Sequence, residues 1–176
     1  MRFVNKLMEK EDFIALKKQY LPGKVEVLFI ADGMPVNNRY FYLKNSSMFR
    51  AVKDAYTQVF GEFSSNDEFL KVFKEMGCYF ESLTVEPIKF LPPKEQAAAR
   101  TAGVKPLADK IAQMQPRLII ISLKTIEKYA REAISISGVA TVEHIVVTPF
   151  PVKSMVNVNN CINGIVAALK TINWEE

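Results

Sequence analysis

The hydrophobic pattern is most continuous between Val25 and Ala31, where nearly every residue is apolar. Turn residues enclose this run, with Pro22-Gly23 before it and Asp32-Gly33 after it. An almost unbroken apolar run between turns is typical of a strand buried on both faces, as strands of parallel sheets are. Ligands of open α/β sheets bind beyond the carboxyl ends of such strands. The loop that begins at Asp32 is therefore a candidate functional site.

Elsewhere, apolar residues fall either in strand-like runs or at helical spacing. The strand at 78–84 alternates apolar with polar residues more than the first strand does, which predicts a less protected place in the sheet. Ser47 and Ser65 are expected to cap helices, the second through a capping box with Glu68. We expect further strands at 78–84, 117–123 and 142–148, and helices at 5–20, 47–60, 66–76, 104–114, 124–133 and 162–172.

The alternation of strands and helices predicts the fold. We expect a single α/β domain over residues 1–176, built as a three-layer α/β/α sandwich around a central four-stranded parallel sheet. In a parallel sheet, the loops that follow the strands lie at one edge. Residues 32–47, 85–94 and 149–159 are therefore expected to converge.

Composition adds a mild preference for a polyanionic partner. The 176 residues are 49% hydrophobic and carry a formal net charge of +4, which is compatible with DNA binding. Two cysteines cannot form a disulfide framework, and the opening MRFVNKLMEKED has no apolar leader, so we expect a cytoplasmic location. The apolar runs are strand-sized, so no membrane partner is expected.

Several kinds of site do not fit the sequence. One histidine and two distant cysteines give no ligand cluster, so no metal site is expected. His144 lies within a predicted strand, where we expect a packing role. ADGMP offers a single glycine, so there is neither a P-loop nor a dinucleotide fingerprint, and no cofactor is expected. A small α/β hydrolase, or a nucleotide-ligand protein of unknown substrate, is one alternative.

The candidate loops combine a carboxylate with amides, cations and aromatic rings. A carboxylate can orient water, an aromatic face can stack on a nucleobase for about 1–3 kcal/mol, and amides or cations can contact base edges or phosphates. This mixture suits a nucleobase, although the aromatic residues of 40–42 can also simply close the top of the core. The residues are Asp32, Asn37, Asn38, Arg39, Tyr40, Phe41 and Tyr42, with Phe150, Lys153 and Ser154 on the opposite loop.

Five segments then follow one another in a characteristic order. They are the strand and turn VEVLFIADGMP, the aromatic loop RYFY, the helix that begins SSMFRAV, a proline-rich loop after the second strand, and a TPFP turn after the fourth. In this order the chain resembles the uracil-DNA glycosylase superfamily, from about Val25 to Leu169. The resemblance rests on the order and character of the segments more than on exact motifs.

The resemblance implies a protein that accepts a flipped, deaminated or damaged base from DNA and hydrolyses its N-glycosidic bond. Asp32 would orient the water, and Phe41, or its neighbour Tyr42, would stack on the base. Thr84, at the end of the second strand, would read the base edge. The turn departs from the family pattern in two ways, because Ala31 replaces a glycine and the proline is displaced to position 35.

The loop after the fourth strand departs further. The family has a histidine followed by proline and serine there, whereas TPFPVKS contains no histidine. The resemblance still implies that Phe150 holds the opened duplex and that Lys153 and Ser154 contact a phosphate. The alternative is a non-catalytic member of the same fold that binds nucleic acid or another ligand. Contacts to DNA would also involve the residues of 37–39.

Overall fold

The apolar run after Pro22-Gly23 forms the central strand of a parallel sheet. β1 (Val27–Ala31) pairs with β2 (Cys78–Ser82) on one side and with β3 (Leu118–Ile121) on the other, and β3 pairs with β4 (His144–Val147). The computed structural model describes residues 8–174, and within them the strand order is β2-β1-β3-β4. The predicted α/β class with a four-stranded parallel sheet is confirmed.

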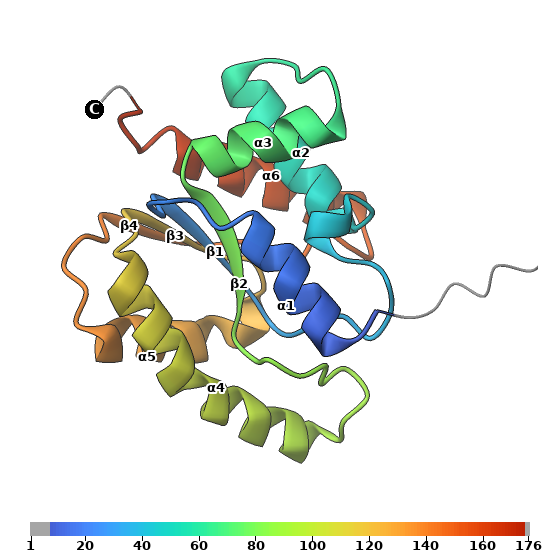
Figure 1. Ribbon diagram of the computed structural model, residues 1–176, viewed down its shortest axis with the longest axis vertical. Coiled ribbons are helices and arrows are strands. Elements are labelled where there is room, and N and C mark those ends of the chain that lie inside the picture. Colours follow the sequence, from blue (N-terminus) through green and yellow to red (C-terminus); the bar gives the residue numbers. More distant parts are fainter. Residues whose placement is uncertain (1–7, 175–176) are drawn as a thin grey trace, which may run out of the picture.

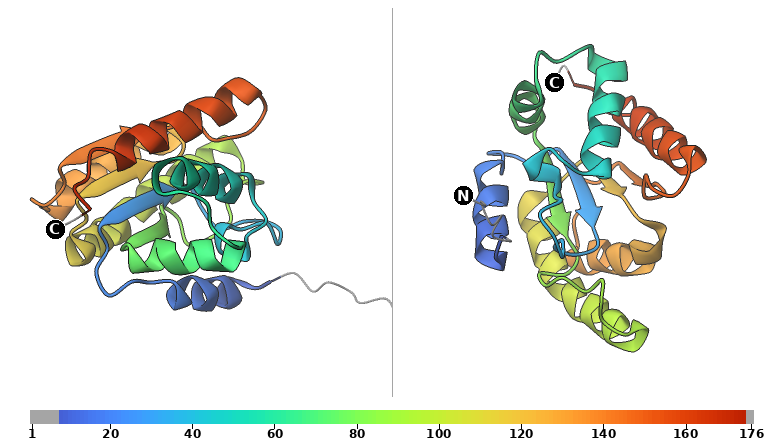
Figure 2. Two further views of the ribbon diagram at one scale, coloured as in Figure 1. Left: turned by 90° about the horizontal axis from the view of Figure 1, so that it is seen from above. Right: turned by 90° about the vertical axis from the view of Figure 1, so that its right-hand side faces the viewer.

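Helices cover both faces of this sheet. Figure 1 shows α2, α3 and α6 on one side and α4 and α5 on the other, whereas α1 lies beside the edge strand β2. The two turned views agree, which makes the arrangement compatible with the expected α/β/α sandwich (Figure 2). The helices are α1 (Lys10–Gln19), α2 (Ser47–Phe60), α3 (Asn66–Glu75), α4 (Pro93–Met114), α5 (Glu127–Ser137) and α6 (Met155–Leu169), with 3₁₀ turns η1 (Phe41–Leu43) and η2 (Lys124–Ile126).

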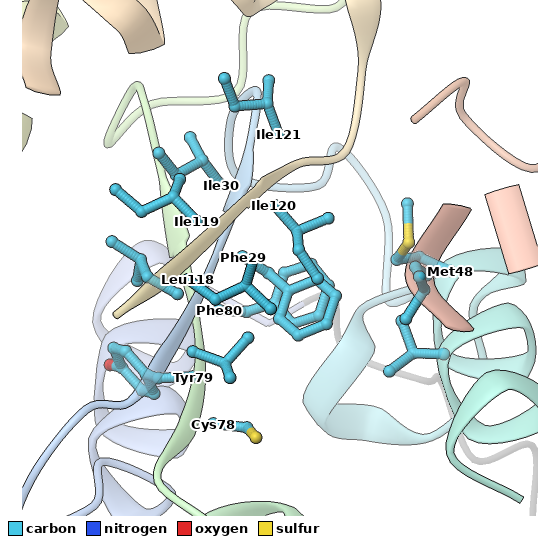
Figure 3. Packing of buried hydrophobic residues seen from close by; sticks show 14 of the residues in the cluster. Phe29, Ile30, Met48, Cys78, Tyr79, Phe80, Leu118, Ile119, Ile120 and Ile121 are labelled. Atoms are coloured by element: carbon cyan, nitrogen blue, oxygen red, sulfur yellow. The ribbon is translucent and has the colours of Figure 1, made fainter. Parts of the chain in front are cut away.

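The core forms on both faces of β1 and β3. Phe29 of β1 stacks on Phe80 of β2 (Figure 3), with ring centroids 4.6 Å apart. The ring centroid of Phe73 from α3 lies 5.8 Å from that of Phe29. Ile30 and Ile119 are likewise fully buried. Residues of both strands are thus buried whichever face they point to, which is why their sequences are apolar throughout.

Side-chain caps fix where α2 and α3 begin. Ser46, rather than the predicted Ser47, caps α2 by accepting a hydrogen bond from the Phe49 amide at 3.1 Å. Ser65 caps α3 as predicted, accepting from the Glu68 amide at 3.0 Å. The Glu68 carboxylate instead accepts from the amide and hydroxyl of Ser64, so the reciprocal half of the expected capping box is displaced by one residue.

The second strand is better protected than its alternating pattern predicts. All five residues of β2 are buried, although β2 is an edge strand. The polar residue Glu81 is buried because it forms ion pairs with Lys17 of α1 and Lys110 of α4. Helices that approach from both sides therefore protect β2, and paired charges allow a polar residue within it.

Four predicted helices have different bounds, and the one expected at 162–172 spans Met155–Leu169. The helix expected at 104–114 begins at Pro93, where proline suits the first turn, and continues through Pro106. The helix expected at 124–133 starts as η2 and extends to Ser137. α1 begins at Lys10, and the predicted residues 5–7 lie outside the described part. No helix among residues 8–174 combines the length and apolarity needed to cross a membrane.

Candidate functional site

A pocket of about 410 Å³ lies at the carboxyl edge of the sheet. Asp32 follows β1, Ser82 ends β2 and Ser122 follows β3, and all three line it. Phe150 reaches the same pocket from the loop after β4. Ile88 and Lys89 line it from the loop after β2, so the predicted convergence of residues 32–47, 85–94 and 149–159 is confirmed.

The sheet topology explains why the pocket forms there. The chain leaves β1 toward β2 on one side and leaves β3 toward β4 on the other, so the loops after these two neighbouring strands diverge. A crevice at such a switch point is the usual ligand site of open α/β sheets. A hollow of about 540 Å³ at the opposite edge, lined by residues including Lys24 and Gly77, lies away from the strand ends where ligands bind.

Asp32 is held by an arginine that the sequence analysis did not identify. Arg100 of α4 donates from Nε to Asp32 Oδ1 at 3.0 Å and from Nη2 to Oδ2 at 2.7 Å. Both residues line the pocket, and the Arg100 side chain is only 13% exposed. The hydrogen bond to Asp32 raises the pKa of Arg100. The pair fixes the orientation of the carboxylate through two parallel bonds.

Two glycines allow the elements that carry this pair to approach closely. A Cβ on Gly103 would lie 2.1 Å from the Leu83 carbonyl oxygen, so only glycine lets α4 pack this near the end of β2. Gly103 lies one helical turn after Arg100, and the close packing brings that guanidinium to Asp32. A Cβ on Gly33 would similarly lie 2.5 Å from Thr84 Oγ1.

Gly103→Ala is expected to lower the free energy of unfolding by about 1–3 kcal/mol, as overpacking does. Alanine normally favours a helix over glycine by about 1 kcal/mol, but here its methyl group would collide with the Leu83 backbone, which cannot rotate away. Urea denaturation measures the change. Gly23→Ala is the matched control, because a Cβ there meets nothing within 4 Å, and equal stabilities of the two variants would contradict the close packing.

Thr84 and Tyr42 do not line the pocket, contrary to the sequence hypothesis. The Thr84 hydroxyl donates to the carbonyl oxygens of Asp32 and Glu86, and its amide donates to Asp32 O at 2.9 Å. Thr84 therefore positions the backbone of Asp32 instead of facing a ligand. Tyr42 is fully buried, its hydroxyl accepts from the Phe80 amide at 2.9 Å, and its ring stacks on Tyr20. Tyr42 thus closes the core.

Phe41 and Phe150 do line the pocket, but they are placed differently. Phe41 is 5% exposed, and its ring centroid lies 4.2 Å from that of Phe80, so it is part of the pocket floor. Phe150 is 38% exposed and stands at the pocket wall. Tyr40 also lines the pocket, and burial, followed by the charge of Glu81, raises its pKa. Phe150 therefore offers the more accessible ring face.

Of the other residues predicted to contact DNA, Arg39 lines the pocket and the rest do not. Arg39 lines the pocket and is exposed. Asn37 accepts from the Arg39 amide at 3.0 Å, and Asn38 accepts from the Met8 amide at 2.9 Å, so these two amides shape the loop. Ser154 caps α6 by accepting from Asn157. Lys153, with φ of 74°, is exposed and does not line the pocket.

The position of Arg100 in the sequence indicates that its side chain is partly buried and needs a partner. Arg100 stands at helical spacing before Val104, Leu107 and Ile111, all of which are buried. A charged residue in phase with a buried face needs a partner, and the structure supplies Asp32. Gln96, one turn earlier, also lines the pocket, and its Nε2 donates to the carbonyl oxygens of Lys89 and Leu91.

The arrangement limits the chemistry available. Burial raises the pKa of Cys78 to about 12 and also raises that of Cys161, so neither thiol is ionised at neutral pH. Ser122 Oγ donates to Ile30 O at 2.8 Å. Asp32 is the carboxylate that lines the pocket, and it can accept hydrogen bonds from water or a ligand. No group of three histidine, cysteine or acidic side chains in residues 8–174 could hold a metal ion.

Comparison with protein-family models and with curated proteins finds no match to this sequence. The geometry of the pocket is therefore the basis on which function is inferred.

Proposed function

We propose that this chain is a uracil-DNA glycosylase-like protein that accepts a base extruded from DNA and hydrolyses its N-glycosidic bond. The supporting observation is that one pocket joins Asp32 and Phe41 from the loop after β1 with Phe150 from the loop after β4, which is far away in the sequence. A carboxylate beside aromatic rings at the carboxyl edge of a parallel sheet suits a flat, polar ligand such as a nucleobase.

The size and lining of the pocket fit such a ligand. Its volume of about 410 Å³ falls within the roughly 300–1,000 Å³ typical of small-molecule sites. Apolar side chains including Met48, Ile88 and Leu123 line it together with the aromatic rings. Extruding a base costs a few kcal/mol, and stacking on one or two rings at about 1–3 kcal/mol each offsets that cost.

Cations at the pocket support a polyanionic ligand. Arg39 and Lys89 line the pocket and are exposed, while the neighbouring acid, Asp32, is already paired with Arg100. Exposed lysine and arginine side chains bind DNA phosphates and release counterions. The formal net charge of +4 acts in the same direction over longer distances.

Asp32 keeps the capacity to orient water while it is paired. Each carboxylate oxygen has two lone pairs, and Arg100 uses one on each. A water bound to a free lone pair can attack the sugar C1′ as the C1′–N bond breaks. The water oxygen then bonds to C1′, and its proton ends on the released base. The negative charge of Asp32 also stabilises positive charge that develops on the sugar.

Asp32→Asn is expected to lower base release by about 100-fold or more, in line with the loss of a positioned general base. Single- and double-stranded oligonucleotides that contain uracil, hypoxanthine or xanthine are incubated with the protein, and abasic sites are cleaved with alkali. Asp109→Asn, which alters an exposed acid on α4, is the control and should keep full activity. If the unmodified protein neither releases nor binds any of these bases, the proposed function is wrong.

A second candidate is binding of the extruded base without hydrolysis. It is favoured by the bidentate Asp32–Arg100 pair, in which the guanidinium balances the carboxylate charge. In this case the oligonucleotides bind with an affinity that falls as salt rises, and no abasic sites form. The same oligonucleotide panel distinguishes the two candidates.

A further inference from the structure

We infer that Arg100 determines which ligand the pocket accepts, and that it selects a 6-oxopurine, the ring system of guanine, hypoxanthine and xanthine. The inference rests on the proposed function in one respect, that the pocket takes a nucleobase. Among the residues that line the pocket, Arg100 is a cation whose side chain is only 13% exposed and is held in a fixed orientation, whereas Arg39 and Lys89 are exposed.

The guanidinium group offers two different bidentate edges. Nε–H and one Nη2–H form the side edge, and an Nη1–H together with the second Nη2–H forms the end edge. Asp32 occupies the side edge, because its oxygens accept from Nε and Nη2. The group is planar and rigid, so fixing the side edge also fixes the direction in which the end edge points.

The end edge is free for a ligand. Arg100 lines the pocket, and its guanidinium makes no hydrogen bond within residues 8–174 other than the two to Asp32. Asp32 therefore orients Arg100 as much as Arg100 orients Asp32. The pocket walls are largely apolar side chains, so a ligand atom that meets this edge replaces water at a site of low dielectric.

Two parallel N–H donors match two adjacent acceptors. Guanine presents O6 and N7 side by side, and a bidentate arginine on this pair is the commonest specific contact between proteins and DNA. Hypoxanthine and xanthine carry the same pair. Adenine presents N7 beside an amino group, whose hydrogens would face an arginine N–H. Uracil and thymine offer each keto oxygen beside a ring N–H or C–H, so either base can satisfy only one donor.

A second polar group in the pocket adds to the match. Ser82 is 8% exposed, lines the pocket, and its hydroxyl makes no hydrogen bond with residues 8–174. The hydroxyl is therefore available to form a hydrogen bond with a ligand in the pocket. A hydroxyl both donates and accepts, so Ser82 can bond to several different bases. Selection among the bases therefore depends on Arg100.

The test measures equilibrium binding of four nucleosides to the full-length protein by calorimetry or NMR titration. Inosine is expected to bind about 10-fold or more tightly than adenosine, uridine and 7-deazainosine, the last of which lacks only the N7 acceptor. Arg100→Lys keeps the charge but loses the fork, so the inosine preference should fall toward 1. Arg131→Lys changes an exposed arginine on α5 and should leave the preference unchanged.

The outcomes separate this inference from the function on which it rests. If inosine, adenosine and 7-deazainosine bind equally to the unmodified protein, the role of Arg100 is wrong, while the nucleobase pocket stands. If no nucleoside binds, the nucleobase pocket itself is wrong. Because 7-deazainosine probes the unmodified protein, the test does not depend on whether the Arg100 variant folds.

Discussion

Phe41→Ala is expected to lower the free energy of unfolding by about 3–5 kcal/mol, the cost of removing a buried aromatic side chain. Phe41 is 5% exposed, and its ring contacts those of Phe80, Tyr42 and Phe73 at centroid distances of 4.2, 5.0 and 5.3 Å. Alanine would leave a cavity among rings that cannot all move inward. Urea denaturation monitored by circular dichroism measures the loss.

The matched control is Phe150→Ala, which removes the phenylalanine predicted to hold the opened duplex. Phe150 is 38% exposed, so this variant should change stability by less than about 1 kcal/mol. It should instead weaken oligonucleotide binding, because Phe150 offers an accessible ring face at the pocket. If Phe41→Ala left stability unchanged and only weakened binding, the packing of Phe41 in the core would be contradicted.

The strands differ in how well their burial could be predicted from the sequence. The strands at Val27–Ala31 and Leu118–Ile121 could be predicted because a doubly buried strand is apolar at every position. The strand at Cys78–Ser82 was expected to be less protected, because its polar residues suggested an exposed face. Local alternation cannot reveal ion pairs that two distant helices contribute, and those pairs are what bury Glu81.

The site shows a similar limit. Asp32 could be predicted as a site residue because an apolar run followed by turn residues marks the end of a buried strand, where ligands of α/β sheets bind. Arg100 lies 68 residues away, and only the packing of α4 against the end of β2 brings it to Asp32. Thr84 was placed at the correct strand end, but the direction of its hydroxyl depends on backbone carbonyl groups that a sequence pattern does not contain.

His144 illustrates how strongly element boundaries affect a residue's environment. The strand expected at 142–148 is shorter, and His144 is its first residue, opposite Leu118, and is exposed. The expected packing role is therefore wrong. An edge strand has neighbours on one side only, so its first residue is easily left uncovered.

Glu81→Ala is expected to lower the free energy of unfolding by about 3–5 kcal/mol, the typical cost of removing one partner from a buried ion pair. Glu81 is 4% exposed, and its Oε1 accepts from Lys17 at 2.5 Å, Lys110 at 3.1 Å and the Ser82 amide at 3.1 Å. Without the carboxylate, the largely buried ammonium group of Lys17 has no counter-charge. The loss is measured by urea denaturation.

Asp109→Ala provides the comparison, because its pair with Lys105 is exposed on the surface of α4. An exposed pair of this spacing contributes about 0.3–0.5 kcal/mol, so the two losses should differ severalfold. Equal losses would contradict the burial of the Glu81 cluster.

The double variant Glu81→Leu with Lys17→Met measures the net contribution of the buried ion pair to the free energy of unfolding. Replacing both charges by apolar side chains of similar size is often neutral or stabilising, because the desolvation penalty disappears with them. We therefore expect the double variant to recover most of the stability that Glu81→Ala loses. Lys110 is 35% exposed and can be solvated when Glu81 is absent. Recovery would mean that these charges specify how α1 and α4 dock on β2, while burial of apolar surface holds them there.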